Sequence, residues 1–149
     1  MEILEHVPEV LVGKRISLRY ERTVPGDISR GLVPYYHFKL IRSDGTVVGH
    51  INFRVGETPH VRNAAGHIGF EILPEHRGQA YSLEACQTIA PFVRSHYSQV
   101  IITTDPTNEP SKRIIEQLGA SFLGEVEVPI NDPAYEKGAR RKMRFEWRP

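Results

Sequence analysis

Residues 66–92 constrain the fold of this chain more than any other segment. They begin with a strand-like run, 66–73, which stops at Pro74 and is followed by a short turn that contains Gly78. From residue 81 to 94 the apolar residues recur at helical spacing, so a helix follows the turn. A strand that leads through such a turn into a helix directs several backbone N–H groups to one point, where the helix dipole also favours negative charge. The segment therefore predicts a phosphate-binding site; the alternative is an ordinary strand-to-helix connection that contains a glycine and a capping residue.

Alternating and β-branched residues predict further strands on both sides of this segment. Residues 16–20, 35–41 and 47–55 have strand character, and Ser43-Asp44-Gly45 is a turn sequence that joins the last two into a hairpin. The continuous apolar run 100–104 predicts a strand covered on both faces and parallel to 66–73. Residues 122–128 and 140–147 predict a second hairpin with a long loop, and 21–34 and 56–65 predict loops.

A second helix is predicted over residues 111–118, because Gly119 follows it in the position that a helix C-cap favours. The order is then strands, a strand-helix-strand-helix unit, and strands again. This order is typical of the α/β (α+β) class with a mixed, mostly antiparallel sheet. The length of 149 residues is that of one domain, so we expect residues 1–149 to form a single domain.

Composition excludes several classes of function. A net charge of +1 argues against nucleic acid as a partner, because binding to the phosphate backbone needs a concentrated cationic surface. The single cysteine, Cys86, lies among the helical positions, and no Cys/His cluster has the spacing of metal ligands, so we expect no metal. Glu2 and Glu5 interrupt any signal-peptide core, and no later stretch has membrane-spanning length. We therefore expect a cytoplasmic protein with no membrane partner.

Two blocks of sequence resemble a known family. Residues 74–85 read P-E-H-R-G-Q-A-Y-S-L-E-A, which resembles the coenzyme A-binding motif of the GNAT superfamily of acyl-CoA-dependent N-acetyltransferases. The form P-E-x-R-G-x-G-Y-A-x-E-A is common in its ribosomal-protein-acetyltransferase-like branch. Residues 108–111 and 116–122 resemble the N-x-x-S helix and the L-G-F ending of the same family. The resemblance covers residues 45–128 well and the rest by strand pattern only.

The resemblance implies the GNAT fold, with a central sheet of about six to seven strands and a central β-α-β-α unit. The fourth and fifth strands should splay apart and hold the pantetheine arm of acetyl-CoA, the co-substrate, in the gap. GNAT folds usually insert two helices between the first and second strands. Residues 21–34 are too short for both, so these first helices should be shortened or missing.

Positions matching the family motifs give the cofactor-binding residues. Backbone groups of Ile72 and Leu73 should contact pantetheine, and Asn108 and Ser111 should contact the arm from the second helix, although both could simply cap that helix. The residues expected around the pyrophosphate are Arg77, Gly78, Gln79, Ala80, Tyr81 and Ser82. Ala80 replaces the glycine usual in the family, which is acceptable only if Ala80 keeps a negative φ.

Two side chains are candidate general bases. Strand alternation puts His67 and Glu71 on one face of the strand 66–73, away from the apolar core positions. His67 stands where related branches often have a catalytic Glu and is the favoured base, with Glu71 second. The alternatives are a structural histidine at His67 and an ion pair across the sheet at Glu71. Backbone N–H groups near Ile72 should stabilise the oxyanion. Ile115 stands where many relatives have a tyrosine that protonates the departing thiolate.

The acceptor site must be built without the missing helices. We expect residues 21–34, with Arg22, Asp27 and Arg30, to border it together with 56–63 and 129–138, unless these are only solvated polar loops; a homodimer partner could also supply a wall. The expected function is acetyl transfer from acetyl-CoA to a primary amine of a small molecule or peptide, by direct attack in a ternary complex. The alternatives are a noncatalytic acyl-CoA-binding regulatory module and an interaction domain without coenzyme.

Overall fold

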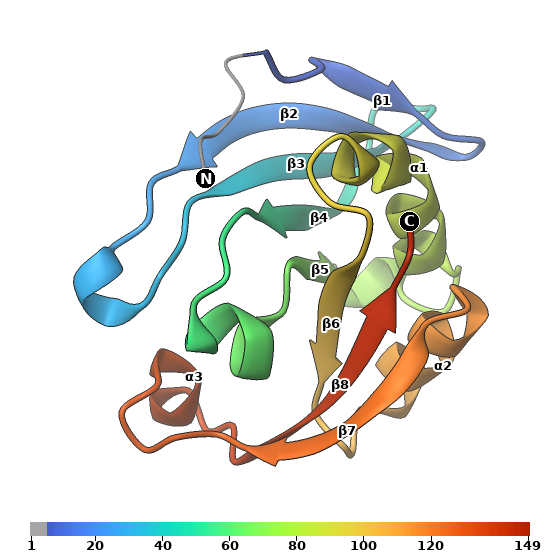
Figure 1. Ribbon diagram of the computed structural model, residues 1–149. Coiled ribbons are helices and arrows are strands. Elements are labelled where there is room, and N and C mark those ends of the chain that lie inside the picture. Colours follow the sequence, from blue (N-terminus) through green and yellow to red (C-terminus); the bar gives the residue numbers. More distant parts are fainter. Residues whose placement is uncertain (1–5) are drawn as a thin grey trace.

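Two antiparallel sheets form the framework in the computed structural model, which describes residues 6–149 (Figure 1). The larger sheet has five strands in sequence order. They are β1 (Val10–Val12), β2 (Ile16–Val24), β3 (Tyr35–Arg42), β4 (Val47–Arg54) and β5 (Ile68–Ile72). The smaller sheet has the order β6-β8-β7, with β6 (Val100–Thr104), β7 (Ser121–Glu127) and β8 (Arg141–Trp147).

Two longer helices and four short helical turns connect the strands. The longer helices are α1 (Tyr81–Arg94), which follows β5, and α2 (Glu109–Gln117), which follows β6. The short ones are η1 (Ile28–Arg30), η2 (Val61–Ala65), η3 (Pro74–His76) and α3 (Pro133–Glu136). The described residues thus have the β-α-β-α unit predicted from the sequence, and only η1 lies where the family's first helices would be. No described helix is long and apolar enough to cross a membrane.

The structure corrects several boundaries. The hairpin β3-β4, the hairpin β7-β8, α1 and β6 were predicted correctly. However, β2 continues to Val24, so residues 21–24 are strand rather than loop, and η2 and α3 lie within segments predicted as loops. Strand β1, which pairs with β2, was not predicted. The described chain has eight strands in two sheets instead of six to seven in one, because β5 and β6 do not pair as strands.

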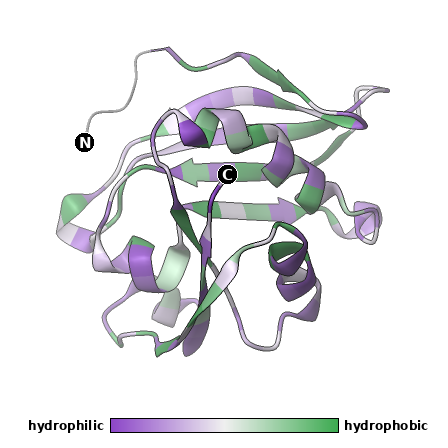
Figure 2. Ribbon diagram, turned by 45° about the vertical axis from the view of Figure 1, so that its right-hand side comes forward, coloured by the Kyte–Doolittle hydropathy of each residue, from purple (hydrophilic) through white to green (hydrophobic). Residues whose placement is uncertain are grey.

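The main core lies between α1 and one face of the five-stranded sheet. Residues along these strands alternate between buried apolar and more exposed polar side chains, visible as bands in Figure 2. Phe38 and Phe53 pack edge-on against Phe92 of α1, with ring centroids 5.9 and 5.8 Å apart. Cys86 is buried in the same core, and burial raises the pKa of its thiol to about 12, so it behaves as an apolar residue.

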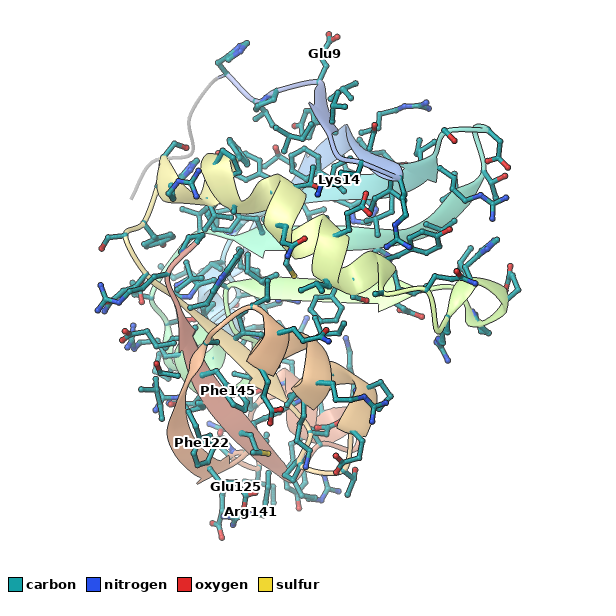
Figure 3. The ribbon with its side chains drawn as sticks, turned by 90° about the vertical axis from the view of Figure 1, so that its right-hand side faces the viewer. Glu9, Lys14, Phe122, Glu125, Arg141 and Phe145 are labelled. Atoms are coloured by element: carbon teal, nitrogen blue, oxygen red, sulfur yellow. The ribbon has the colours of Figure 1, made fainter. Side chains whose placement is uncertain are left out.

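The smaller sheet joins this core through Val100 and Ile102 of β6 and through Phe145 and Trp147 of β8. Figure 3 shows α2 beside its strands and Phe122 near Phe145, whose ring centroids are 5.4 Å apart. Gly119, with φ of 79°, ends α2 as predicted, since its N–H bonds to the Glu116 carbonyl. Because β5 and β6 belong to different sheets, the two sheets diverge on the side where α1 and α2 begin. The site described below lies where they diverge.

Glu84 fixes the first turn of α1 to the start of β2. Its carboxylate accepts hydrogen bonds from the backbone N–H groups of Arg15 and Ile16, at 2.7 and 2.8 Å, and from Arg15 Nε at 2.8 Å. Burial would raise the pKa of Glu84, but the Arg15 guanidinium and the two N–H donors outweigh it and lower the pKa below its ordinary value. The ionised carboxylate therefore stabilises the folded state.

Replacing Glu84 with glutamine should destabilise the protein by about 2 kcal/mol at pH 7, since the amide NH2 group that replaces one carboxylate oxygen cannot accept a hydrogen bond and the negative charge beside Arg15 is lost. Because the pKa is lowered by folding, this stabilisation is present above the ordinary carboxyl range and is lost as the pH falls through the folded pKa. Urea unfolding at pH 7 and pH 4 should therefore show a smaller wild-type advantage at pH 4. Glu116→Gln, on an exposed residue of α2, is the control, and an equal loss there would contradict the assignment.

Candidate active site

His67 is the last link between the two sheets before they separate. Its N–H donates to the Ile101 carbonyl at 2.7 Å, and the Ile101 N–H donates back to His67 Nδ1 at 2.9 Å. Next to it, Gly66 approaches β6 so closely that a Cβ would lie 2.9 Å from the Ile101 oxygen. Beyond this point β5 and β6 belong to different sheets. The structure thus confirms the predicted splaying of the two strands.

The edge of β5 that faces the gap carries free backbone groups. At its two ends, the Leu73 N–H donates to Val48 and the His67 carbonyl accepts from Arg54, both on β4. Because hydrogen bonding alternates along an antiparallel strand, the N–H and C=O groups of Phe70 and Ile72 point away from β4, toward β6. Phe70 therefore presents a backbone donor and acceptor to the gap.

The turn before α1 and the first turn of the helix form a cradle of N–H groups. Within residues 6–149, no acceptor bonds to the backbone N–H groups of residues 78–83. Gly78 and Ala80 both have left-handed conformations, with φ of 85° and 58°, and α1 begins immediately after them. Successive N–H groups in such a turn, together with the helix dipole, bind anions. The cradle fits the pyrophosphate of a nucleotide cofactor.

The backbone conformation of Ala80 was not anticipated from the sequence. A negative φ was expected, yet Ala80 has φ of 58° and ψ of 28°, and no other non-glycine residue of the described chain has a positive φ. The left-handed region costs an alanine about 1–2 kcal/mol, because its Cβ approaches the following carbonyl. The cradle keeps the shape that a glycine would give, at the expense of backbone strain.

Replacing Ala80 with glycine should raise the free energy of unfolding by about 0.5–1 kcal/mol, since relief of this strain exceeds the entropy that glycine adds to the unfolded chain. Urea denaturation at neutral pH measures the difference. Gln79→Gly is the matched control: Gln79 has no positive φ, so glycine there should lower stability. Stabilisation by both substitutions, or by neither, would contradict a strained Ala80.

Two cavities meet at the gap between the sheets. The first, of about 640 Å³, lies along the cradle and the start of α2. The second, of about 780 Å³, lies beyond β5 toward η2 and α3. Both are lined by Phe70, Asn108 and Ser111, so these residues mark their junction. We call the first the cradle cavity and the second the distal cavity.

Most of the expected cofactor-binding residues line the cradle cavity. They are Ile72, Arg77, Gly78, Gln79, Ala80, Tyr81, Ser82, Asn108 and Ser111. Leu73 does not line it. Arg77 Nε donates to the Ile72 carbonyl at 2.9 Å, which fixes the guanidinium beside the cavity but occupies one backbone group expected to meet pantetheine. Asn108 accepts from the Ser111 N–H at 3.2 Å and so caps α2, whatever else it contacts.

The distal cavity is bordered by the three segments that sequence reasoning assigned to the acceptor site. Arg30 comes from residues 21–34, His60 from 56–63, and Pro133, Ala134, Glu136 and Lys137 from 129–138. Arg22 and Asp27 do not line it. Asp27 instead caps η1, where its carboxylate accepts from the Ser29 N–H. The loops are thus brought together around one cavity, with η1 in the place of a longer helix.

His67 does not line either cavity. Its side chain is 1% exposed and lies against the Tyr97 ring, 4.9 Å between centroids. Since Nδ1 accepts from Ile101, the proton is on Nε2, which lies 3.2 Å from the Glu57 carboxylate. Burial lowers the pKa of His67, although Glu57 opposes the shift. His67 therefore has no free lone pair with which to accept a proton, and this geometry contradicts its favoured place as general base.

Glu71 lies on the sheet face opposite α1 and lines the cradle cavity next to Phe70. It is directly opposite His50 in the β4-β5 register. Burial and the neighbouring His37 lower the pKa of His50, and Glu71 opposes this shift. Glu71 is therefore an exposed carboxylate close to the junction.

Sequence reasoning missed a further candidate general base, His60, which is paired with Asp132. His60 Nδ1 donates to the two carboxylate oxygens of Asp132, at 2.9 and 3.0 Å, and His60 lines the distal cavity. Among described residues no partner contacts Nε2, so its lone pair is free. They lie 72 positions apart in the sequence and in two different loops, so no local pattern signalled the pair. Ile115 is fully buried, so the structure offers no acid at that position.

No group of three or more potential metal ligands occurs among residues 6–149. The model of the GNAT acetyltransferase domain matches residues 19–121, which includes the gap, the cradle and α2. The chain belongs to the GNAT acetyltransferase family. No curated protein sequence matches it significantly.

Solved GNAT structures share the fold. An acetyltransferase from Bacillus anthracis has a TM-score of 0.65 and 18% identity, covering 92% of this chain and 96% of its own. The ribosomal-protein-S5-alanine acetyltransferase of Vibrio fischeri has a TM-score of 0.57 and 18% identity over 77% of this chain and 64% of its own. RimJ of Mycobacterium smegmatis, solved with CoA-disulfide, has a TM-score of 0.58 and 19% identity, covering 75% of this chain and 52% of its own. This likeness shows that the chain has the same fold as these enzymes.

Proposed function

We propose that this GNAT domain transfers an acetyl group from acetyl-CoA to a primary amine of a small molecule or peptide, by direct attack in a ternary complex. The observation that carries the proposal is the junction of the two cavities at Phe70, between the splayed strands. One cavity offers N–H donors for a pyrophosphate, and the other is large enough for a small molecule or the end of a peptide. Both substrates can therefore meet at one residue.

The cofactor side of the site rests on the chain's own donors. The N–H groups of residues 78–83 would hold the pyrophosphate, and Arg77 would add positive charge beside it. Acetyl-CoA supplies an acetyl group activated as a thioester. The coenzyme bound to the Mycobacterium smegmatis structure, which has the same fold, supports this choice of cofactor.

On the reaction side, the N–H of Phe70 is the free donor closest to the junction and would stabilise the developing oxyanion. The amine must lose a proton as its bond to the acetyl carbon forms and the carbon–sulfur bond breaks. Glu71 can accept this proton from the cradle side, and His60, oriented by Asp132, from the distal side. The thiolate leaves without an acid at Ile115, since a thiol has a modest pKa of about 8.5.

Release of free thiol from acetyl-CoA, together with the mass of the acetylated product, tests the proposal on a panel of primary amines. Glu71→Gln and His60→Gln should each be compared with wild type across pH. The variant that lacks the true base should lose about 100-fold or more in kcat and lose the acidic limb of the profile. Binding of acetyl-CoA without turnover of any amine would instead favour the noncatalytic acyl-CoA-binding module.

A further inference from the structure

Arg54 is a cation built into the wall of the distal cavity. It lies on β4, on the sheet face opposite α1, and its Nη1 donates to the carbonyls of Ala65 and Gly66, both at 3.3 Å. The guanidinium rests on Gly69 of β5: a Cβ there would lie 2.9 Å from Nη1 and 3.2 Å from Nη2. The absence of a side chain at Gly69 is therefore what makes room for the guanidinium.

The charge of Arg54 has no counterion. No carboxylate of residues 6–149 forms an ion pair with it, and the Tyr35 ring lies 5.9 Å from its Cζ. Of the other basic side chains that line the cavity, Lys142 pairs with Asp105 at 2.9 Å, while Arg30 and Lys137 form no ion pair with any described residue but are exposed to solvent. Burial lowers the pKa of Arg54, because the charged form is poorly solvated in the wall of the cavity. A half-buried, unpaired guanidinium is costly unless an anion compensates it.

The donors left over on Arg54 define the shape of that anion. Nη1 is directed to the two carbonyls, while Nε and Nη2 have no partner among described residues. These two nitrogens form one edge of the guanidinium fork, whose parallel N–H groups match the two oxygens of a carboxylate. The planar geometry favours a carboxylate over a single hydroxyl or carbonyl oxygen.

We propose that the acceptor of this acetyltransferase carries a carboxylate that binds Arg54, so that the substrates are amino-carboxylates rather than neutral amines. This inference rests on the proposed function, because it assigns the distal cavity to the acceptor. The carboxylate is held at the wall of the cavity, and the amine reaches the junction at Phe70. A neutral amine lacks the group that offsets the buried charge.

The test compares matched acceptors that differ only in this group. A series of ω-amino acids of increasing chain length is assayed beside the corresponding carboxamides, with acetyl-CoA saturating. Wild type should prefer the carboxylate by about 10- to 100-fold in kcat/KM at the best length, the range expected for hydrogen bonds to a charged group. In Arg54→Gln the ratio should fall to about 1. Arg94→Gln, on an exposed residue at the end of α1, should keep the wild-type ratio.

Two further measurements separate the possible failures. Calorimetry should show unchanged acetyl-CoA affinity in Arg54→Gln; if that variant does not fold, Gly69→Ala, which displaces the guanidinium, should reduce the ratio instead. Equal rates for carboxylates and amides in wild type, an unchanged ratio in Arg54→Gln, or a preference for matching aminophosphonates would overturn the proposal. If no amine is acetylated, the proposed function fails, and titration of wild type with the amino acids then decides: binding that Arg54→Gln retains, or no binding, overturns the carboxylate site as well.

Discussion

Replacing Ser82 with aspartate is expected to weaken acetyl-CoA binding by about 100-fold or more without weakening the fold. Ser82 is the second residue of α1 and lines the cradle cavity. A carboxylate there lies beside the pyrophosphate, and repulsion of about 3 kcal/mol between partly buried charges corresponds to this factor. The same carboxylate interacts favourably with the helix dipole, so helix stability should rise by about 0.5 kcal/mol. Calorimetry measures the first effect and urea unfolding the second.

The opposite signs of these two effects make the experiment specific. Ser82→Asn changes the shape of the side chain in the same way without adding charge, and should retain affinity within a few-fold of wild type. If Ser82→Asp binds acetyl-CoA as tightly as Ser82→Asn does, the pyrophosphate does not lie at the start of α1. A loss of affinity accompanied by a loss of stability would point to damage to the helix instead.

Replacing His67 with alanine should lower the free energy of unfolding by about 3 kcal/mol. The substitution leaves the Ile101 N–H without an acceptor in a buried position and opens a cavity beside Tyr97. Because His67 is the last link between the two sheets, the loss should also loosen the gap that positions Phe70. Chemical denaturation gives the stability change directly.

His67→Asn distinguishes this structural role from catalysis. The asparagine oxygen can take the place of Nδ1 and accept from Ile101, so this variant should recover part of the stability. Its kcat/KM should keep the acidic limb of the wild-type pH profile, because the base lies elsewhere. A stable His67→Asn protein that loses this limb would restore His67 as the general base.

The sequence was most informative where local pattern and local structure coincide. The helical spacing in residues 81–94 and the apolar run 100–104 predicted α1 and β6 with their observed ends. Gly78 and the motif around it predicted a phosphate cradle, and the structure adds free N–H groups at that place. The missing first helices also followed directly from the length of 21–34. The single-domain organisation of residues 1–149 stays a prediction.

Features set by distant contacts could not be predicted. Strand alternation put His67 on the same face as Glu71. Alternation does not reveal that the Ile101 N–H donates a hydrogen bond to His67 Nδ1. The pair His60–Asp132 joins two loops, and Arg54 lies over Gly69 only because β4 and β5 are adjacent. The φ of Ala80 is likewise set by how the turn leads from β5 to α1, and the negative φ expected from the sequence was wrong.

The central claim is that the N–H groups before and within the first turn of α1 bind acetyl-CoA. Amide NMR of the labelled wild-type protein during titration with acetyl-CoA tests it most directly. We expect saturable shifts with one-to-one stoichiometry, largest for the amides of residues 78–83 and extending to Phe70. A folded protein whose amides in this segment do not respond to excess acetyl-CoA, or that responds only elsewhere, would contradict the account.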